Sequence, residues 1–152
     1  NEVDKLALFA RDEKTITAGH VEALAGHNRI FGAFEVIEAT ISGNRLQAIA
    51  RLRNMFEEDK SAEYTVVGAF AYHLRRMFSA KAMLEKGAGA GEVAQKLRIW
   101  SNKERFFAQL RRASLEQLGK YIEDLAAIDY AVKTGQAKTQ VAMEQLVLKL
   151  AG

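Results

Sequence analysis

The sequence contains neither cysteine nor proline. Without cysteine, the chain can have no disulfide, no thiolate metal site and no cysteine nucleophile. Proline interrupts helices and punctuates loops, so its absence from 152 residues favours an almost wholly helical chain with short connections. The sequence also lacks an uninterrupted apolar run of the roughly 20 residues that a membrane-spanning helix needs. We therefore expect no membrane partner.

The beginning of the sequence lacks the basic start and apolar run of a signal peptide. The absence of cysteine fits a cytoplasmic protein, which is what we expect. Asn1 stands where an initiating methionine would be, so we expect the chain to be a piece of a longer protein. Hydrophobic residues make up 49% and charged residues 27%, which is typical of a globular domain. The length suits one domain with a small part of a second.

Apolar residues recur at intervals of three and four through most of the sequence, which predicts amphipathic helices and no strands. We expect these helices over 31–41, 44–56 with Leu46 and Leu52 on its apolar face, 61–86, around 93–97, 102–110, 114–135 and from 139 onward. Ser114 and Gln117 have the spacing of a capping box, and Gly43 and Gly135 are placed to end helices. The fold class predicted is an all-α helical bundle.

The N-terminal part looks too small to form a core of its own. Residues 2–11 read as the end of one helix, and Thr17 is placed to cap a short helix that closes at Gly26. We interpret residues 27–29 as a linker. This predicts a domain boundary between residues 1–26 and 27–152.

Residues that often carry catalysis or bind cofactors occur here in unsuitable settings. The glycine-rich segment 87–91 follows a helix and lacks the Gly-Lys-Ser/Thr ending of a phosphate-binding loop, so we interpret it as a connection between helices. His20, His27 and His73 are scattered without metal-ligand spacing, and we predict that His73 packs beside an apolar stripe. We expect no catalytic residue, no cofactor site and no metal site.

Asp129 falls on the apolar stripe of its predicted helix, where an unpaired carboxylate would be costly. Lys133 follows four residues later, in the favourable order for an ion pair along a helix. The two residues form either a local salt bridge or a contact with a neighbouring helix or subunit. Asp129, Tyr130 and Lys133 are therefore our candidates for a subunit interface.

Positive charge is concentrated in the middle of the sequence, since residues 65–112 carry ten basic and three acidic side chains, a net +7. The candidates for contact with nucleic-acid phosphates are Arg75, Arg76, Lys103, Arg105, Arg111 and Arg112. Tyr72 and Trp100 could stack on bases. Because these side chains lie on three predicted helices, a solvated or protein-facing surface is the alternative.

The order of short motifs resembles the delta subunits of bacterial DNA polymerase III clamp loaders. The opening Asn1-Glu-Val-Asp-Lys-Leu, then Ile16-Thr17 and Val21-Glu-Ala-Leu24, is similar to the end of the lid domain in that family. Residues 31–50 look like its first collar helices. The C-terminal series Leu125, Asp129, Lys133, Gly135 followed by Ala142-Met-Glu-Gln-Leu146 resembles the end of the family's collar domain.

This resemblance implies a collar-like helical bundle preceded by a short helical remnant of an AAA+ lid domain. It also implies a non-catalytic part that assembles with the other clamp-loader subunits, in a complex that serves DNA replication by DNA polymerase III. The sliding clamp would bind through an N-terminal domain absent from this sequence, and DNA would be met through the assembled complex. No catalytic residue carries over.

Two other functions remain open from the sequence. One is a stand-alone helical module that binds nucleic acid through the basic stretch 75–112. The other is a helical adaptor or ligand-sensing domain, which would need a sizeable apolar pocket.

Overall fold

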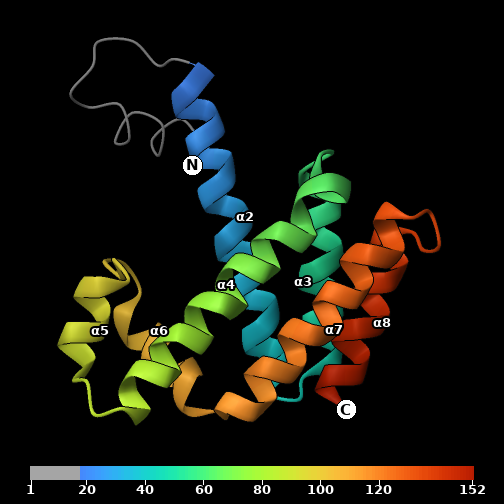
Figure 1. The fold of residues 1–152 in the computed structure, drawn as a ribbon. Helices are drawn as coiled ribbons and strands as arrows, with labels where there is room; N and C mark the ends of the chain where they lie inside the picture. The colour runs from blue at the N-terminus through green and yellow to red at the C-terminus, as the bar shows by residue number, and fades with distance from the viewer. Residues whose placement is uncertain (1–17) are drawn as a thin grey trace.

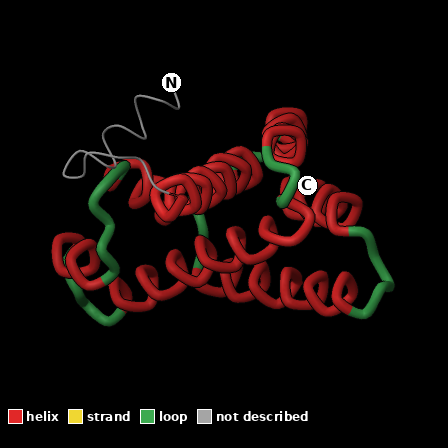
Figure 2. Tube along the Cα trace, turned by 90° about the horizontal axis from the view of Figure 1, so that it is seen from above, coloured by secondary structure: helices red, strands yellow, loops and turns green. Residues whose placement is uncertain are grey.

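The computed structural model describes residues 18–152, which form helices joined by short loops and contain no strand (Figures 1 and 2). The helices are α2 (Ala18–Ile41), α3 (Arg45–Glu58), α4 (Ala62–Glu85), α5 (Ala90–Lys96), α6 (Lys103–Arg111), α7 (Leu115–Lys133) and α8 (Thr139–Ala151). The predicted all-α bundle is confirmed. The predicted helix over 2–11 and the predicted cap at Thr17 lie outside the described residues.

Five longer helices form the bundle. Helix α2 packs against α3, α4 and α8, while α4 also packs against α7, and α7 pairs with α8. The short helices α5 and α6 follow the C-terminal end of α4 and contact it on one side of the bundle (Figure 1). Helix α4 is therefore shared between the bundle and the α5–α6 segment.

The core is one continuous apolar cluster to which every described helix contributes. The largest fully buried side chains are Val36 from α2, Leu52 from α3, Val66 and Met77 from α4, Val93 from α5, Leu110 from α6, Leu118 from α7 and Met143 from α8. Burying a side chain of this size stabilises a fold by about 1.5–3 kcal/mol relative to leaving it exposed. Because α5 and α6 share this core, they are part of the domain and not an appendage.

Several helix ends follow the local signals in the sequence. Asn44 Oδ1 accepts a hydrogen bond from the backbone of Gln47 at the start of α3, and Ser114 and Gln117 form the predicted capping box of α7. Gly43 and Gly135 have φ values of +74° and +76°, which suit glycine after a helix. These short-range signals place the ends of α2, α3 and α7 correctly.

The residue before α4 has the type of a helix cap but does not act as one. Ser61 precedes α4, but its side chain makes no capping hydrogen bond. Its hydroxyl instead donates to Asp59 Oδ1 at 2.6 Å. This hydrogen bond is the main cause that lowers the pKa of Asp59 below its usual value. A serine at the right position therefore stabilises the preceding turn and not the helix end.

The predicted linker at residues 27–29 is wrong, because α2 continues without interruption from Ala18 to Ile41. A single glycine such as Gly26 costs a helix only about 1 kcal/mol, which tertiary contacts can offset. Leu24 is buried, and Arg29 Nη1 donates to Asp59 Oδ2 at 3.5 Å across the turn between α3 and α4. These contacts hold the residues around Gly26 in the helix.

The predicted apolar face of α3 is also partly wrong. Leu52 is fully buried, as expected, whereas Leu46 is 87% exposed. The core side of α3 is occupied by Ala48 and Leu52. Leu46 is two positions before Ala48, about 200° around a helix with 3.6 residues per turn, and therefore points to solvent.

A buried polar chain crosses the core between α2, α4 and α6. The side-chain amide nitrogen of Gln109 donates to the carbonyl oxygen of Phe34 at 3.1 Å, so its Oε1 is the acceptor for Nε2 of His73 at 2.6 Å. His73 and Gln109 are 2% and 3% exposed. His73 is thus a packing residue, as predicted, although it lies at the centre of the core and not beside it.

We predict that His73 makes the stability of the fold depend on pH. Burial lowers its pKa from 6.5 to about 4. The unfolded chain binds a proton near pH 6.5 and the folded chain only near pH 4, so the free energy of unfolding falls as the pH is lowered through this range. We expect a loss of about 2 kcal/mol between pH 7.5 and pH 5, measured by urea denaturation.

His73→Gln is the control, because glutamine has a neutral donor and no proton to gain. The free energy of unfolding of the variant at pH 5 is compared with that of the same variant at pH 7.5. We expect most of the decrease seen in the unaltered chain to be absent. An equal loss in the variant and the unaltered chain would show that another group causes the pH dependence.

Candidate functional site

A groove with a volume of about 550 Å³ lies on the described surface between α4 and the end of α5. We call it the α4–α5 groove, and it is lined by Gly68, Tyr72, Arg75, Arg76, Ser79, Lys96, Leu97 and Arg98. Gly68, Tyr72, the neighbours Arg75 and Arg76, and Ser79 are spaced one helical turn apart, which places these α4 residues on one face of the helix. That face lies next to the buried face that carries Phe70, His73 and Met77.

Arg76 builds the floor of this groove. One of its terminal nitrogens donates to the carbonyl oxygens of Leu97 and Arg98 at 3.0 and 2.7 Å. Its guanidinium lies 5.8 Å from the ring centre of Tyr72 and 5.9 Å from that of Phe106. Arg98 has a left-handed backbone with φ of +54°, so the chain leaving α5 depends on these contacts. Arg76 therefore has a structural role.

The remaining cations of the groove, Arg75, Lys96 and Arg98, are exposed. Lys96 forms an exposed ion pair with Glu92 at 3.4 Å, one turn earlier in α5. Pairs of this kind contribute little, because solvent screens them. Arg75 and Arg98 have no ion pair among the described residues. The α4–α5 groove thus presents positive charge with little compensation.

The six basic residues predicted to contact nucleic acid do not form one surface. Arg75 and Arg76 line the α4–α5 groove. Arg105 pairs with Glu38 of α2 at 2.6 Å, and Arg112 donates to the hydroxyl of Ser42, just after α2, at 2.9 Å. The other two, Lys103 and Arg111, lie exposed at the two ends of α6. Of the predicted set, only Arg75 and Arg76 share the groove.

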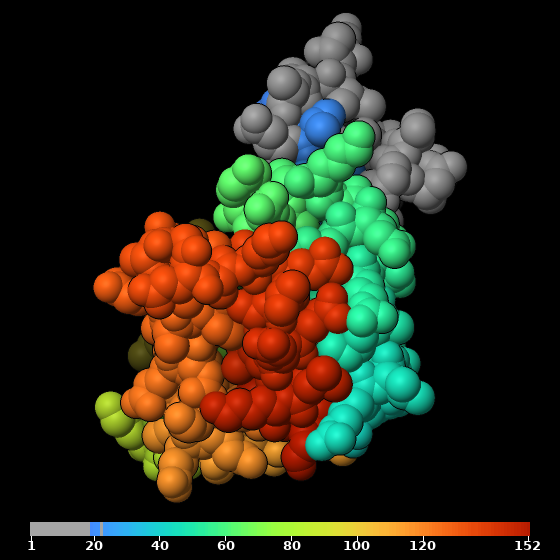
Figure 3. Space-filling view, turned by 90° about the vertical axis from the view of Figure 1, so that its right-hand side faces the viewer, coloured from blue at the N-terminus to red at the C-terminus, as the bar shows by residue number. Residues whose placement is uncertain are grey.

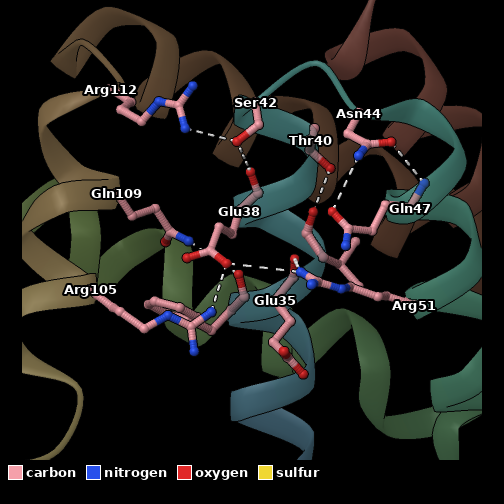
Figure 4. A network of polar contacts seen from close by, with 12 residues as sticks. Glu35, Glu38, Thr40, Ser42, Asn44, Gln47, Arg51, Arg105, Gln109 and Arg112 are labelled. Carbon is pink, nitrogen blue, oxygen red and sulfur yellow. Dashed lines mark hydrogen bonds and ion pairs between the residues drawn. The ribbon is translucent and has the colours of Figure 1, made fainter.

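Glu38 on α2 is the centre of a polar network that the sequence did not predict (Figure 4). Its carboxylate lies 2.6 Å from Arg105 of α6 and 3.9 Å from Arg51 of α3. Arg51 also donates to the carbonyl oxygen of Glu35 at 3.0 Å. Glu38 therefore links α2 to α3 through Arg51 and to α6 through Arg105.

The predicted interface residues lie near the C-terminal end of α7. Asp129 and Lys133 form the predicted local salt bridge at 2.8 Å, with side chains 41% and 73% exposed. Tyr130 is 66% exposed, although tyrosine is a residue that gains much by burial. This end of α7 thus presents an aromatic ring beside a charged pair.

Helices α7, α8 and α3 form one continuous face, with α8 in the middle (Figure 3). Arg53 of α3 and Glu144 of α8 form an ion pair at 2.8 Å, and this contact lowers the pKa of Glu144. Val141 and Leu148 of α8 are 53% and 44% exposed. The face therefore has a charged contact between α3 and α8 and still exposes apolar side chains.

Three residues that shape these surfaces were missed in the sequence, namely Gln109, Glu38 and Gly68. The sequence did contain an indication that Gln109 is buried, because it is a polar residue among Phe106, Phe107 and Leu110 in a short predicted helix. Asp129 was singled out by the same kind of pattern. Glu38 and Gly68 carried no such signal. Their roles depend on which helices lie opposite them.

Residues 18–152 contain no group of three or more histidine, aspartate or glutamate side chains that could hold a metal ion. In the same range, no helix has the length and apolar character to cross a membrane.

The comparisons with known proteins agree with one another. A family profile described as the C-terminal domain of the DNA polymerase III delta subunit matches residues 32–150. The DNA polymerase III subunit delta of Bacillus subtilis (strain 168) is 25% identical over 150 residues, which are 98% of this chain and 43% of that protein. The structure of the Bacillus subtilis DNA clamp loader delta protein matches with a TM-score of 0.73 and 25% identity, over 99% of this chain and 44% of that one. The chain thus spans less than half the length of these relatives.

We predict that Gly68→Ala stabilises the fold. A Cβ atom at Gly68 would meet no atom of the described residues within 4 Å, so alanine adds helix propensity without a clash. We expect the free energy of unfolding in urea to rise by about 0.5–1 kcal/mol.

Gly32→Ala in α2 is the matched control, since its Cβ would lie 3.1 Å from Cε of Met55 and part of the gain would be lost. A decrease in stability for Gly68→Ala would mean that the space at Gly68 is not open in solution.

Proposed function

Because the chain belongs to the family formed by the C-terminal domains of DNA polymerase III delta subunits, we propose that it is the assembly part of a clamp-loader delta subunit, which joins a collar with the other loader subunits. Membership confirms the family resemblance drawn from the sequence. The collar role itself is our inference. The observation that supports it most is that α7 and α8 expose apolar side chains.

A protein that joins a collar needs a rigid body and a surface that gains by burial. The core of this bundle includes side chains from every described helix, which makes the body rigid. Helices α7 and α8 expose large apolar side chains to solvent, namely Tyr130, Val141 and Leu148. Interfaces typically place aromatic and aliphatic side chains at their centre and charged ones at the rim. The α7–α8 pair offers both kinds.

Within this surface we assign different weights to the three predicted interface residues. Tyr130 is the anchor, because its ring can be fully desolvated by a partner. Asp129 and Lys133 already pair with each other and are largely exposed, so their contribution is at the rim. They would steer the partner and add little affinity.

We assign the rest of the protein from the family. Residues 1–26 would be the end of an AAA+ lid domain and residues 27–152 the collar domain, with the boundary now falling inside α2. A preceding AAA+ domain would bind the sliding clamp, and the whole subunit would act without catalysis of its own in a complex that loads the clamp for DNA polymerase III. Such a protein works in the cytoplasm, where it meets DNA through the assembled complex.

A second candidate is a stand-alone module that binds nucleic acid through the stretch 75–112. Trp100 is 73% exposed two residues after Arg98, which favours it. The contacts of Arg105 with Glu38 and of Arg112 with Ser42 weigh against it, because they divide the basic stretch. We therefore rank it below the collar.

We predict that Tyr130→Ala weakens assembly. The experiment mixes the chain with the C-terminal domains of the other loader subunits from its own organism and measures the complex by light scattering after size-exclusion chromatography. Loss of an interface anchor typically costs about 2 kcal/mol, so we expect roughly thirtyfold weaker binding.

Tyr64→Ala is the matched control, because Tyr64 is 84% exposed in the first turn of α4, a helix outside the α7–α8 pair. Asp129→Asn should change affinity by less than about fivefold. Equal losses for Tyr64→Ala and Tyr130→Ala would place the interface elsewhere, and no complex at micromolar concentration would end the collar proposal.

A further inference from the structure

We propose that the α4–α5 groove binds an acidic segment of a partner protein. No residue of α7 or α8 lines the groove, so it is separate from the surface assigned to the collar. The inference does not depend on the collar role. It rests on the positive charge of the groove, on its shape, and on the contact between its one aromatic side chain, Tyr72, and the guanidinium of Arg76.

The positive charge of the groove favours an anionic ligand. Arg75, Lys96 and Arg98 line it, and no carboxylate is among the lining residues. The nearest described acid in sequence is Glu92, which faces Lys96 at 3.4 Å. Arginine guanidinium groups match carboxylates in planar, two-pronged hydrogen bonds. Acidic side chains are therefore suited to this site.

The shape of the groove favours a polypeptide that approaches α4 closely. The groove face of α4 runs from Gly68 to Ser79, roughly 16 Å along the helix, and has a small residue at each end. A side chain at Gly68 would find open space, so nothing in the described chain requires glycine there. Glycine in a helix interior is destabilising, and close approach of another backbone is one reason for it.

The aromatic side chains argue against a nucleic acid in the groove. Tyr72 is the only aromatic residue that lines it, and the guanidinium of Arg76 already lies 5.8 Å from its ring centre. Trp100 is exposed but does not line the groove. Single-stranded nucleic acids need free rings and a continuous basic track. The basic residues beyond the groove do not continue such a track, because Arg105 pairs with Glu38 and Arg112 donates to Ser42.

The test uses the whole 152-residue chain and a defined probe. The probe is a fluorescein-labelled, alanine-based helical peptide of about 15 residues with glutamates along one face. A second peptide has glutamine at each of those positions. By fluorescence anisotropy at low salt, we expect the glutamate peptide to bind at least tenfold more tightly.

Three variants locate the binding. Arg75→Gln with Arg98→Gln should weaken the glutamate peptide at least tenfold. Arg111→Gln with Lys138→Gln removes the same charge from exposed positions outside the groove and should change the affinity less than twofold. Gly68→Leu should weaken binding at least tenfold without lowering Tm, which separates blockage of the groove from unfolding.

Each contrary result overturns the proposal. An equal loss in both charge variants would mean general attraction to a basic protein. Full binding by Gly68→Leu would place the peptide outside the groove. An oligo(dT) strand of similar charge that binds more tightly than the peptide, and is lost with the Arg75 and Arg98 changes, would make the groove a nucleic-acid surface.

Discussion

The amide of Gln109 joins two helices that are distant in the sequence, and the position of α6 depends on it. Its oxygen accepts from His73 of α4 and its nitrogen donates to Phe34 of α2, all within the core. A buried polar group that loses its partner costs about 1–3 kcal/mol. The three helices are therefore confined to arrangements that keep both hydrogen bonds. Apolar packing alone would tolerate more sliding.

Both exposed surfaces follow from this placement of α4 and α6. Because His73 points into the core, Tyr72 and Arg75 face the side where α5 packs. The carbonyl groups at the end of α5 then come within reach of Arg76, which closes the groove at its base. Helix α4 also packs against α7, and no residue of α7 or α8 lines the groove. The two surfaces thus share no residue, and two different partners could occupy them together.

The two surfaces differ in kind. The α7–α8 surface exposes Tyr130, Val141 and Leu148 and pairs its charges internally, which suits a stable contact driven by apolar burial. The α4–α5 groove keeps Arg75 and Arg98 without an ion pair among the described residues, which suits a partner of opposite charge. Affinity for the first would change little with salt, whereas affinity for the second would fall as salt rises.

The sequence by itself determined the helical class and most helix ends, because spacing, capping and glycine placement act within a few residues. Asn44, Ser114 and Gly135 did in the structure what their local pattern indicated. Tertiary structure alone decided that α2 continues through residues 27–29, that Leu46 faces solvent, and that the basic residues of 75–112 divide between the groove and α2. Each of these outcomes depends on which helix lies opposite, and a periodic pattern shows which residues share a face but not what that face meets.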